Sequence, residues 1–117
     1  MTAETFNKLL NLRLAKIVES LGQKANEYAT DDRLHNFKEA GKTFECLPTE
    51  ACWAYMMKHL VSIKDLANGT KKGSPDLIHE KIGDAINYLV LMEALLLEAN
   101  ADETIDKAMG VSNAGSK

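Results

Sequence analysis

Residues 74–99 read SPDLIHEKIGDAINYLVLMEALLLEA, and this segment predicts one long central helix. Ser74 is a typical N-cap residue and Pro75 fits a first helical position, so we expect the helix to start there and to end near Ala99. When the segment is drawn as a helix, its apolar side chains cover nearly the whole circumference. Such a helix is central in its domain or shared with a partner subunit. In a chain of 117 residues we therefore expect a homodimer.

The N-terminal part of the chain predicts an amphipathic helix. Apolar residues recur at three- and four-residue spacing from Phe6 onward, and good helix formers after Gly22 extend the expected helix to about Tyr28. A glycine inside a helix costs about 1 kcal/mol relative to alanine, which this helix is expected to tolerate. Three polar residues fall between the apolar ones and are expected to face water: Arg13, Lys16 and Glu19.

Two further helices are expected between these segments. Residues 33–40 predict a short helix that Gly41 closes at its C′ position. Pro48 predicts the start of a third helix, which Asn68 and Gly69 end. Four apolar residues of this third helix are expected in the core: Trp53, Met56, Met57 and Leu60.

These elements predict an all-α fold, a bundle of about four helices that forms one domain over residues 1–117. No segment alternates apolar and polar residues convincingly enough to indicate a strand. Residues 103–117 are expected to be a loose C-terminal segment. The apolar content of 45% and the net charge of −3 argue against intrinsic disorder.

The charge and the hydropathy of the chain indicate which partners and which cellular compartment to expect. Fourteen Lys and Arg against seventeen Asp and Glu leave no basic excess, so duplex nucleic acid is not expected as a partner. No apolar run approaches the roughly 20 residues that span a bilayer, and the N-terminus lacks the pattern of a secretion signal. Cys46 and Cys52 have no metal-ligand spacing and are expected to be reduced thiols. We therefore expect a cytoplasmic protein without membrane association.

Polar residues at helical spacing interrupt the apolar surface of the helix over residues 74–99. Glu80, Asp84 and Asn87 are four and three residues apart, so they share one helix face. Because an ionised carboxylate away from water needs a cation or a hydrogen-bond donor, this face suits a hard cation such as Mg²⁺. From spacing alone, a solvated helix end or a structural ion pair with Lys58 or Arg33 also explains the pattern.

A second acidic group, Glu27 and Asp31, lies near the expected end of the first helix. If the first and fourth helices are antiparallel, the C-terminal end of one meets the N-terminal half of the other. Glu27 and Asp31 then approach Glu80 and Asp84, and four carboxylates so close together require a cation. In isolation, capping aspartates at a solvated helix end explain this second group equally well.

The segment EKIGDAINY, residues 80–88, resembles the acidic helix of the MazG-like all-α nucleoside triphosphate pyrophosphohydrolases. The chain is most similar to small phage domains of this group, which are termed nucleotide-modification-associated. The matching elements cover residues 24–97. Apart from the acidic helix they are Lys24 with Tyr28, Asn36 with Phe37, and Lys58-His59-Leu60.

The resemblance implies a MazG-like fold and a Mg²⁺-dependent hydrolysis of a nucleoside triphosphate to the monophosphate and pyrophosphate. The implied Mg²⁺ ligands, which would also activate the attacking water, are Glu27, Asp31, Glu80 and Asp84. The implied catalytic residues are Glu80, Asp84 and Lys58, the last offsetting charge on the leaving pyrophosphate. The implied substrate-binding residues are Lys24, Asn36, Phe37, His59 and Asn87. A degenerate relative that only binds the nucleotide carries the same motifs.

An alternative function belongs to a different class. A small helical phage protein with an acidic surface binds and modulates another protein, such as a host protein, without catalysis. This alternative predicts that Glu80→Gln leaves folding and partner binding intact. It also predicts no change in melting temperature when Mg²⁺ and nucleotide are added, whereas a true site raises it.

Overall fold

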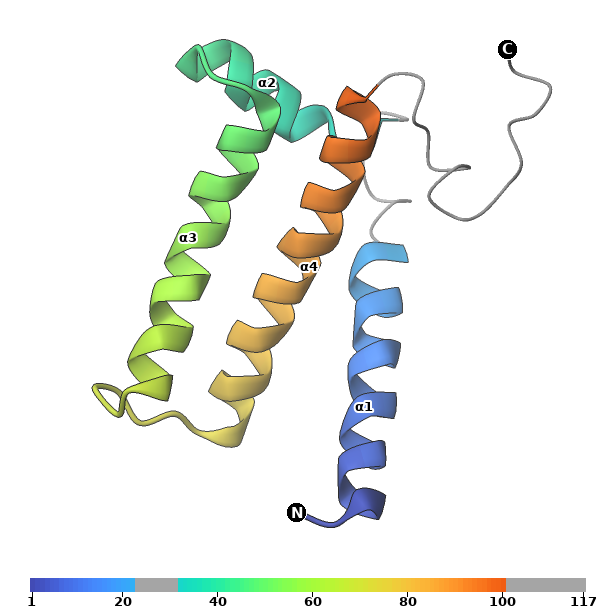
Figure 1. The fold of residues 1–117 in the computed structure, drawn as a ribbon, viewed down its shortest axis with the longest axis vertical. Helices are drawn as coiled ribbons and strands as arrows, with labels where there is room; N and C mark the ends of the chain where they lie inside the picture. Colours follow the sequence, from blue (N-terminus) through green and yellow to red (C-terminus); the bar gives the residue numbers. More distant parts are fainter. Residues whose placement is uncertain (23–31, 101–117) are drawn as a thin grey trace, which may run out of the picture.

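The structure is a computed structural model that describes residues 1–22 and 32–100 of the chain. This part is helical and contains no strand (Figure 1), which confirms the predicted all-α class. The helices are α1 (Ala3–Ile17), continued by a π-helical turn η1 (Val18–Gly22), then α2 (His35–Phe44), α3 (Pro48–Ala67) and α4 (Pro75–Ala99). None of the described helices is long and apolar enough to cross a membrane.

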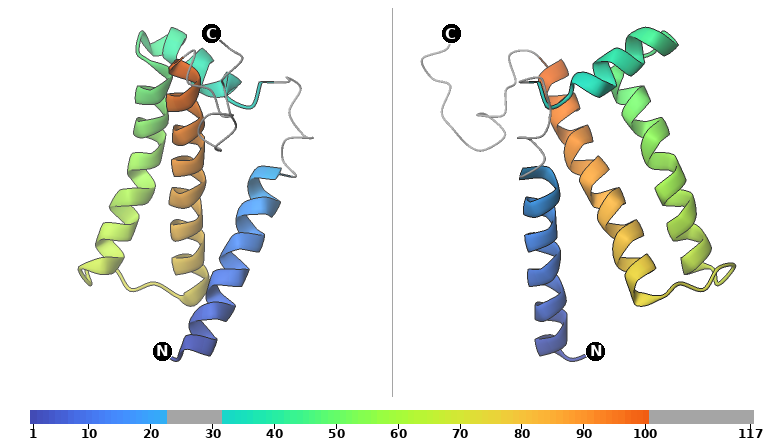
Figure 2. Two further views of the ribbon diagram at one scale, coloured as in Figure 1. Left: turned by 45° about the vertical axis from the view of Figure 1, so that its right-hand side comes forward. Right: turned by 180° about the vertical axis from the view of Figure 1, so that it is seen from behind.

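The helices are arranged as an α3–α4 hairpin with α2 across one end and α1 along the outer side of α4 (Figures 1 and 2). In both figures α1 and α4 run in the same direction, so the antiparallel arrangement considered as a condition for bringing the two acidic groups together is not observed. The reason is that α2 lies across the bundle instead of along it. The chain therefore makes one reversal fewer than four long antiparallel helices require.

The long helices of the hairpin begin and end where the sequence predicts. At the start of α4 the Ser74 hydroxyl accepts a hydrogen bond from the backbone N–H of Leu77 at 3.2 Å, and Pro75 occupies the first turn. At the start of α3 the carboxylate of Glu50 accepts the backbone N–H of Leu47 at 2.9 Å. Both starts are local features, which is why sequence patterns located them.

Helix α2 differs from its prediction at both ends, because it begins at His35 and continues through Gly41 to Phe44. Gly41 is buried against the connection to α3, and a Cβ there would lie 2.7 Å from the carbonyl oxygen of Cys46. The left-handed residue that ends the helix is Glu45, with φ 55°. Gly41 thus lies inside the helix, where its missing side chain lets the backbone of Cys46 come close. A glycine in the local sequence fits this role as well as it fits a helix end.

The core lies where α2 meets the α3–α4 hairpin. Leu34, Phe37, Cys52 and Leu95 form its buried cluster. Met56 is 1% exposed, whereas Trp53 and Met57 are 51% and 37% exposed, so the core placement of these last two is wrong. Helix α3 contacts α4 along one side and α2 at one end, which leaves its other sides open. Both cysteines are free thiols, as expected, and burial raises the pKa of the Cys52 thiol.

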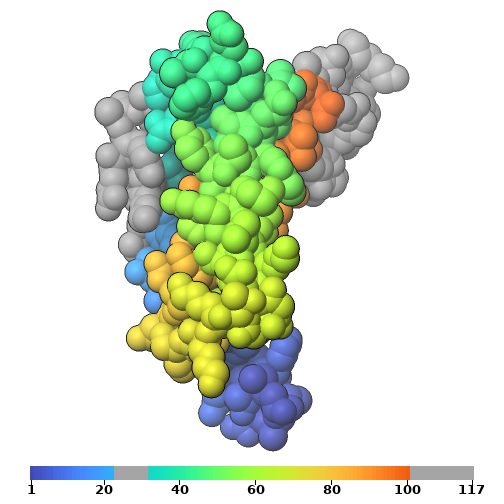
Figure 3. Space-filling view, turned by 90° about the vertical axis from the view of Figure 1, so that its left-hand side faces the viewer, coloured from blue at the N-terminus to red at the C-terminus, as the bar shows by residue number. Residues whose placement is uncertain are grey.

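Helix α1 lies at the edge of the molecule. None of its residues is buried, and Figure 3 shows its first turn projecting beyond the connection between α3 and α4. The apolar side chains at four-residue spacing are 46–69% exposed, so they do not pack into the core as an amphipathic helix would predict. We call these side chains the α1 stripe: Phe6, Leu10, Leu14 and Val18.

An ion cluster ties the start of α2 to the end of α4. The ammonium of Lys38 lies 2.6 Å from a carboxylate oxygen of Asp32 and 2.6 Å from one of Glu98. The other oxygen of Asp32 accepts the backbone N–H of Leu34 at 3.0 Å. The hydrogen bond from Lys38 lowers the pKa of Asp32, and the bonds to both carboxylates raise the pKa of Lys38. This cluster holds α2, which carries Asn36 and Phe37, against α4.

Lys38→Met is expected to lower the free energy of unfolding at pH 7 by about 0.5–1 kcal/mol, since all three side chains are partly exposed and the attraction is screened. The pKa of Asp32 is lower in the folded chain, so its contribution is complete above the ordinary value of 3.8 and is lost as the pH falls below it. The difference between wild type and Lys38→Met should therefore shrink below about pH 4. Urea titrations at pH 7, 5 and 3 measure it. Lys42→Met, which removes the exposed pair with Glu39, is the control and should show a smaller effect at every pH.

Candidate functional site

A cleft of about 500 Å³ separates α1 from the N-terminal half of α4. We call it the α1–α4 cleft. Both helices contribute polar side chains to the cleft. The N-terminal helix supplies cationic and hydroxyl groups, and α4 supplies carboxylates and an amide. The polar side chains that line the cleft include Arg13, Lys16, Ser20, Glu80, Asp84 and Asn87.

Arg13 forms the contact between the two helices. Its guanidinium donates a hydrogen bond to the backbone carbonyl of His79 at 3.0 Å. A Cβ at Gly83 would lie 2.5 Å from the nearest guanidinium nitrogen, so the glycine makes room for the arginine. The expectation that Arg13 faces water is therefore wrong. The side chain that orients α1 on α4 is polar, and the α1 stripe faces elsewhere.

Arg13→Met is expected to loosen α1 without unfolding the hairpin. The lost hydrogen bond from a charged donor at a half-exposed site is worth about 1 kcal/mol, which corresponds to roughly fivefold faster amide exchange in α1. Hydrogen exchange resolved by residue measures the change in α1 and in α3. Lys8→Met is the matched control, because Lys8 lies in the same helix and pairs only weakly with Glu4 at 3.6 Å. Equal protection of α1 in all three proteins would contradict the assigned role of Arg13.

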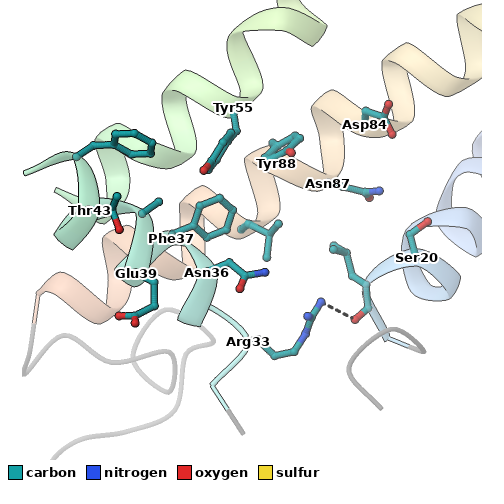
Figure 4. A pocket seen from close by; sticks show the side chains of 14 residues that line it. Ser20, Arg33, Asn36, Phe37, Glu39, Thr43, Tyr55, Asp84, Asn87 and Tyr88 are labelled. Carbon is teal, nitrogen blue, oxygen red and sulfur yellow. Dashed lines mark hydrogen bonds between the residues drawn. The ribbon is translucent and has the colours of Figure 1, made fainter. Parts of the chain in front are cut away.

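A second cavity of about 630 Å³ lies beneath α2, and we call it the aromatic pocket. Figure 4 shows Phe37 at its centre with Tyr55 and Tyr88 close by. The ring centroid of Phe37 lies 6.1 Å from that of Tyr55 and 6.4 Å from that of Tyr88. The amides of Asn36 and Asn87 line the same pocket, so flat apolar surfaces stand next to hydrogen-bonding groups.

The cleft and the pocket lie next to each other. Ser20, Asp84 and Asn87 line both of them. Arg33 lies at the side of the pocket nearest to α1 and donates a hydrogen bond to the carbonyl of Leu21 at 3.3 Å (Figure 4). A charged cleft and an aromatic pocket are therefore neighbours on the two sides of these shared residues.

The structure brings several of the sequence-predicted residues into this site. Glu80, Asp84 and Asn87 share the wall of the cleft, and Asn36 and Phe37 line the pocket. Ser20, near the end of the described N-terminal helix, stands opposite Asp84 and Asn87 in the first half of α4. This contact forms although α1 and α4 are parallel, because Asp84 lies more than two turns into α4 and not at its first residue.

Other predicted residues lie elsewhere. Lys58 is exposed on α3 and is not among the residues that line the cleft or the pocket. His59 is only 9% exposed, and its Nδ1 lies 3.4 Å from an oxygen of Asp84. The basic side chain that lies next to Asp84 is therefore His59. The predictions for Lys24, Glu27 and Asp31 fall outside the described residues.

The site contains three functional candidates that the sequence interpretation missed, namely Arg13, Lys16 and Ser20. They are three and four residues apart and so share one face of the N-terminal helix. These three residues have the same kind of helical spacing as Glu80, Asp84 and Asn87. That spacing is the sequence pattern that could have identified them as one side of a site. Arg13 and Lys16 were instead expected to face water, as the polar side of an amphipathic helix.

The cleft offers a small set of oxygen donors for a divalent cation. The described residues contain no group of three or more His, Cys, Asp or Glu side chains placed to hold a metal. Mg²⁺ is commonly held by one or two carboxylates while phosphate and water complete its shell. Glu80 and Asp84, with the amide oxygen of Asn87 beside them, fit that smaller requirement.

Comparisons with known proteins leave the geometry as the basis for assigning a function. A scan of protein-family models, a search of curated proteins and a search of solved structures each found no match to this chain.

Proposed function

We propose that this protein is a Mg²⁺-dependent nucleoside triphosphate pyrophosphohydrolase of the MazG-like type, or a degenerate relative that binds the nucleotide without hydrolysing it. The observation that carries the proposal is that the charged cleft and the aromatic pocket adjoin, with Asp84 and Asn87 lining both. A nucleotide has the same two-part chemistry, a flat base at one end and a polyphosphate at the other.

The cleft supports the phosphate end of this assignment. Arg13 and Lys16 lie on its α1 wall, opposite the carboxylates of α4. An arginine carries five N–H donors, and the hydrogen bond to His79 uses one of them. Arg13 and Lys16 thus take the role that the sequence assigned to Lys58, which is to offset negative charge on the phosphates.

The pocket supports the base end. A nucleobase stacks favourably on aromatic rings, at about 1–3 kcal/mol per base. Tyr55, which is 43% exposed, offers an accessible ring in the pocket, and the buried ring of Phe37 packs beside it (Figure 4). The amides of Asn36 and Asn87 each supply both donors and acceptors, which suits the hydrogen-bonding edge of a base.

Glu80 and Asp84 are the described residues that would hold Mg²⁺, with Asn87 beside them. Their four-residue spacing places both carboxylates on the face of α4 that lines the cleft. The cation would supply charge neutralisation at the phosphates and a lowered pKa of a bound water. Asp84 also borders the aromatic pocket, so its carboxylate is well placed to orient a water near the α-phosphate.

The test is an assay of pyrophosphate release from a panel of canonical and modified ribo- and deoxynucleoside triphosphates, with and without Mg²⁺. Mg²⁺-dependent release from at least one nucleotide supports the hydrolase. Melting temperatures with Mg²⁺ and each nucleotide identify a degenerate relative, because a ligand at 100 times its Kd stabilises the fold by about 2.7 kcal/mol. No turnover and no shift with any nucleotide would overturn both forms of the proposal.

We also propose that the chain is a homodimer and that a second copy covers the α1 stripe. A 15-residue helix with no buried residue is marginal in water, so its exposed face needs a partner. The small net charge of −3 opposes self-association only weakly.

Light scattering after size-exclusion chromatography measures the mass of the wild type and of Leu10→Glu/Leu14→Glu. The wild type should have twice the mass of the chain and the variant the mass of one chain, because the added carboxylates would lie in an apolar interface. Lys8→Glu, which adds negative charge elsewhere on α1, should remain dimeric. A monomeric wild type would overturn the dimer.

A further inference from the structure

His59 is a buried polar side chain that the proposed substrate contacts do not use. It lies on α3 with 9% of its surface exposed, and its ring stacks on Tyr88 with centroids 5.4 Å apart and an interplanar angle of 29°. Its Nδ1 is buried and has no hydrogen-bond partner among the described residues. The polar atom that faces Nδ1 is Oδ2 of Asp84, at 3.4 Å.

A buried nitrogen without a partner is costly, at about 1–3 kcal/mol, so this placement needs an explanation. An ionised carboxylate only accepts hydrogen bonds. The arrangement that satisfies both groups is therefore an imidazole that carries a proton on Nδ1 and donates it to Asp84. Shortening the separation by about 0.5 Å gives an ordinary charge-assisted hydrogen bond.

The location of Asp84 gives this contact a functional consequence. Its carboxylate lies where the cleft and the aromatic pocket meet. The contact with Nδ1 engages one oxygen and restricts rotation of the carboxylate, which leaves the other oxygen for the cleft. Tyr88 limits movement of the imidazole in turn, and it also lines the aromatic pocket.

We propose that His59 is a positioning residue: its Nδ1–H holds one oxygen of Asp84 so that the other is presented to a divalent cation in the α1–α4 cleft. The inference rests on the proposed function in that it takes Asp84 as a cation ligand. It changes the role expected for His59, which acts behind Asp84 instead of on the substrate. Hydrogen-bond partners of ligating carboxylates typically change metal affinity 10- to 100-fold when they are removed.

Calorimetric titration of Mn²⁺ into the full chain tests the inference without an activity assay. His59→Leu and His59→Gln should weaken Mn²⁺ binding 10- to 100-fold. His59→Asn should retain affinity within about threefold, because its amide nitrogen stands near the position of Nδ1, whereas that of Gln extends toward the position of Nε2. Melting temperatures of the variants establish that they are folded under the conditions of the titration.

The ¹⁵N spectrum of the imidazole, recorded without metal, supplies a second readout. A free imidazole favours the proton on Nε2, so a proton on Nδ1 in the wild type that moves to Nε2 in Asp84→Ala supports the contact. A proton on Nε2 in the wild type would overturn the inference. Equal Mn²⁺ affinity in wild type and His59→Leu would also overturn it while leaving the proposed function in place. If the wild type binds no Mn²⁺, the proposed metal site fails, and with it the role of His59 toward a cation.

Discussion

Asp84→Asn is expected to reduce Mg²⁺-dependent release of pyrophosphate on the order of 100-fold or more, with little change in melting temperature. The substitution keeps the shape of the side chain and its position between the cleft and the aromatic pocket, but it removes the negative charge that a cation needs. An amide oxygen still accepts a hydrogen bond from Nδ1 of His59, 3.4 Å away in the wild type, so the packing around His59 is preserved.

The matched control for this experiment is Glu93→Gln. Glu93 is exposed on the same helix, lines neither cavity, and loses the same charge on substitution. Its rate of hydrolysis should stay within about twofold of the wild type, because isolated surface charges at this distance are largely screened. Hydrolysis by Asp84→Asn at the wild-type rate would remove Asp84 from the active site. A cooperative loss of folding would show instead that its charge is structural.

Met56→Ala is expected to have the largest effect on stability, lowering the free energy of unfolding by about 2–5 kcal/mol. Met56 is 1% exposed, so its removal leaves a cavity between α3 and its neighbours that the packed helices fill only in part. For a domain of this size the corresponding fall in melting temperature is about 10–20 °C.

Met57→Ala is the control for Met56→Ala, since it makes the same chemical change at the next residue of α3. Met57 is 37% exposed, so much less apolar surface returns to water and the loss should stay below about 1.5 kcal/mol. Denaturant unfolding of both variants in parallel measures the difference. Equal losses of unfolding free energy in the two variants would contradict this expectation. They would mean that Met57 is buried as deeply as Met56, for example in an assembly.

The sequence predicted the elements of the fold better than their arrangement. The starts of α3 and α4 were correct because Pro48, Ser74 and Pro75 act through hydrogen bonds and backbone angles within one helical turn. The grouping of Glu80, Asp84 and Asn87 on one face was correct for the same reason, since helical spacing alone determines it. Gly41 was misplaced because its role depends on Cys46, which reaches it only when the chain folds back at the end of α2.

The amino-acid sequence by itself determined that this chain is helical, where its two long hairpin helices lie, and which carboxylates of α4 lie side by side. Tertiary structure alone decided that α1 runs parallel to α4, because α2 lies across one end of the hairpin. It also brought Arg13 to a carbonyl and a glycine that are 66 and more residues away in the sequence. It also decided that His59 is buried beside Asp84 and that Lys58 is exposed. Helical periodicity records which side chains share a face, but the neighbour that each face meets depends on the packing of whole helices.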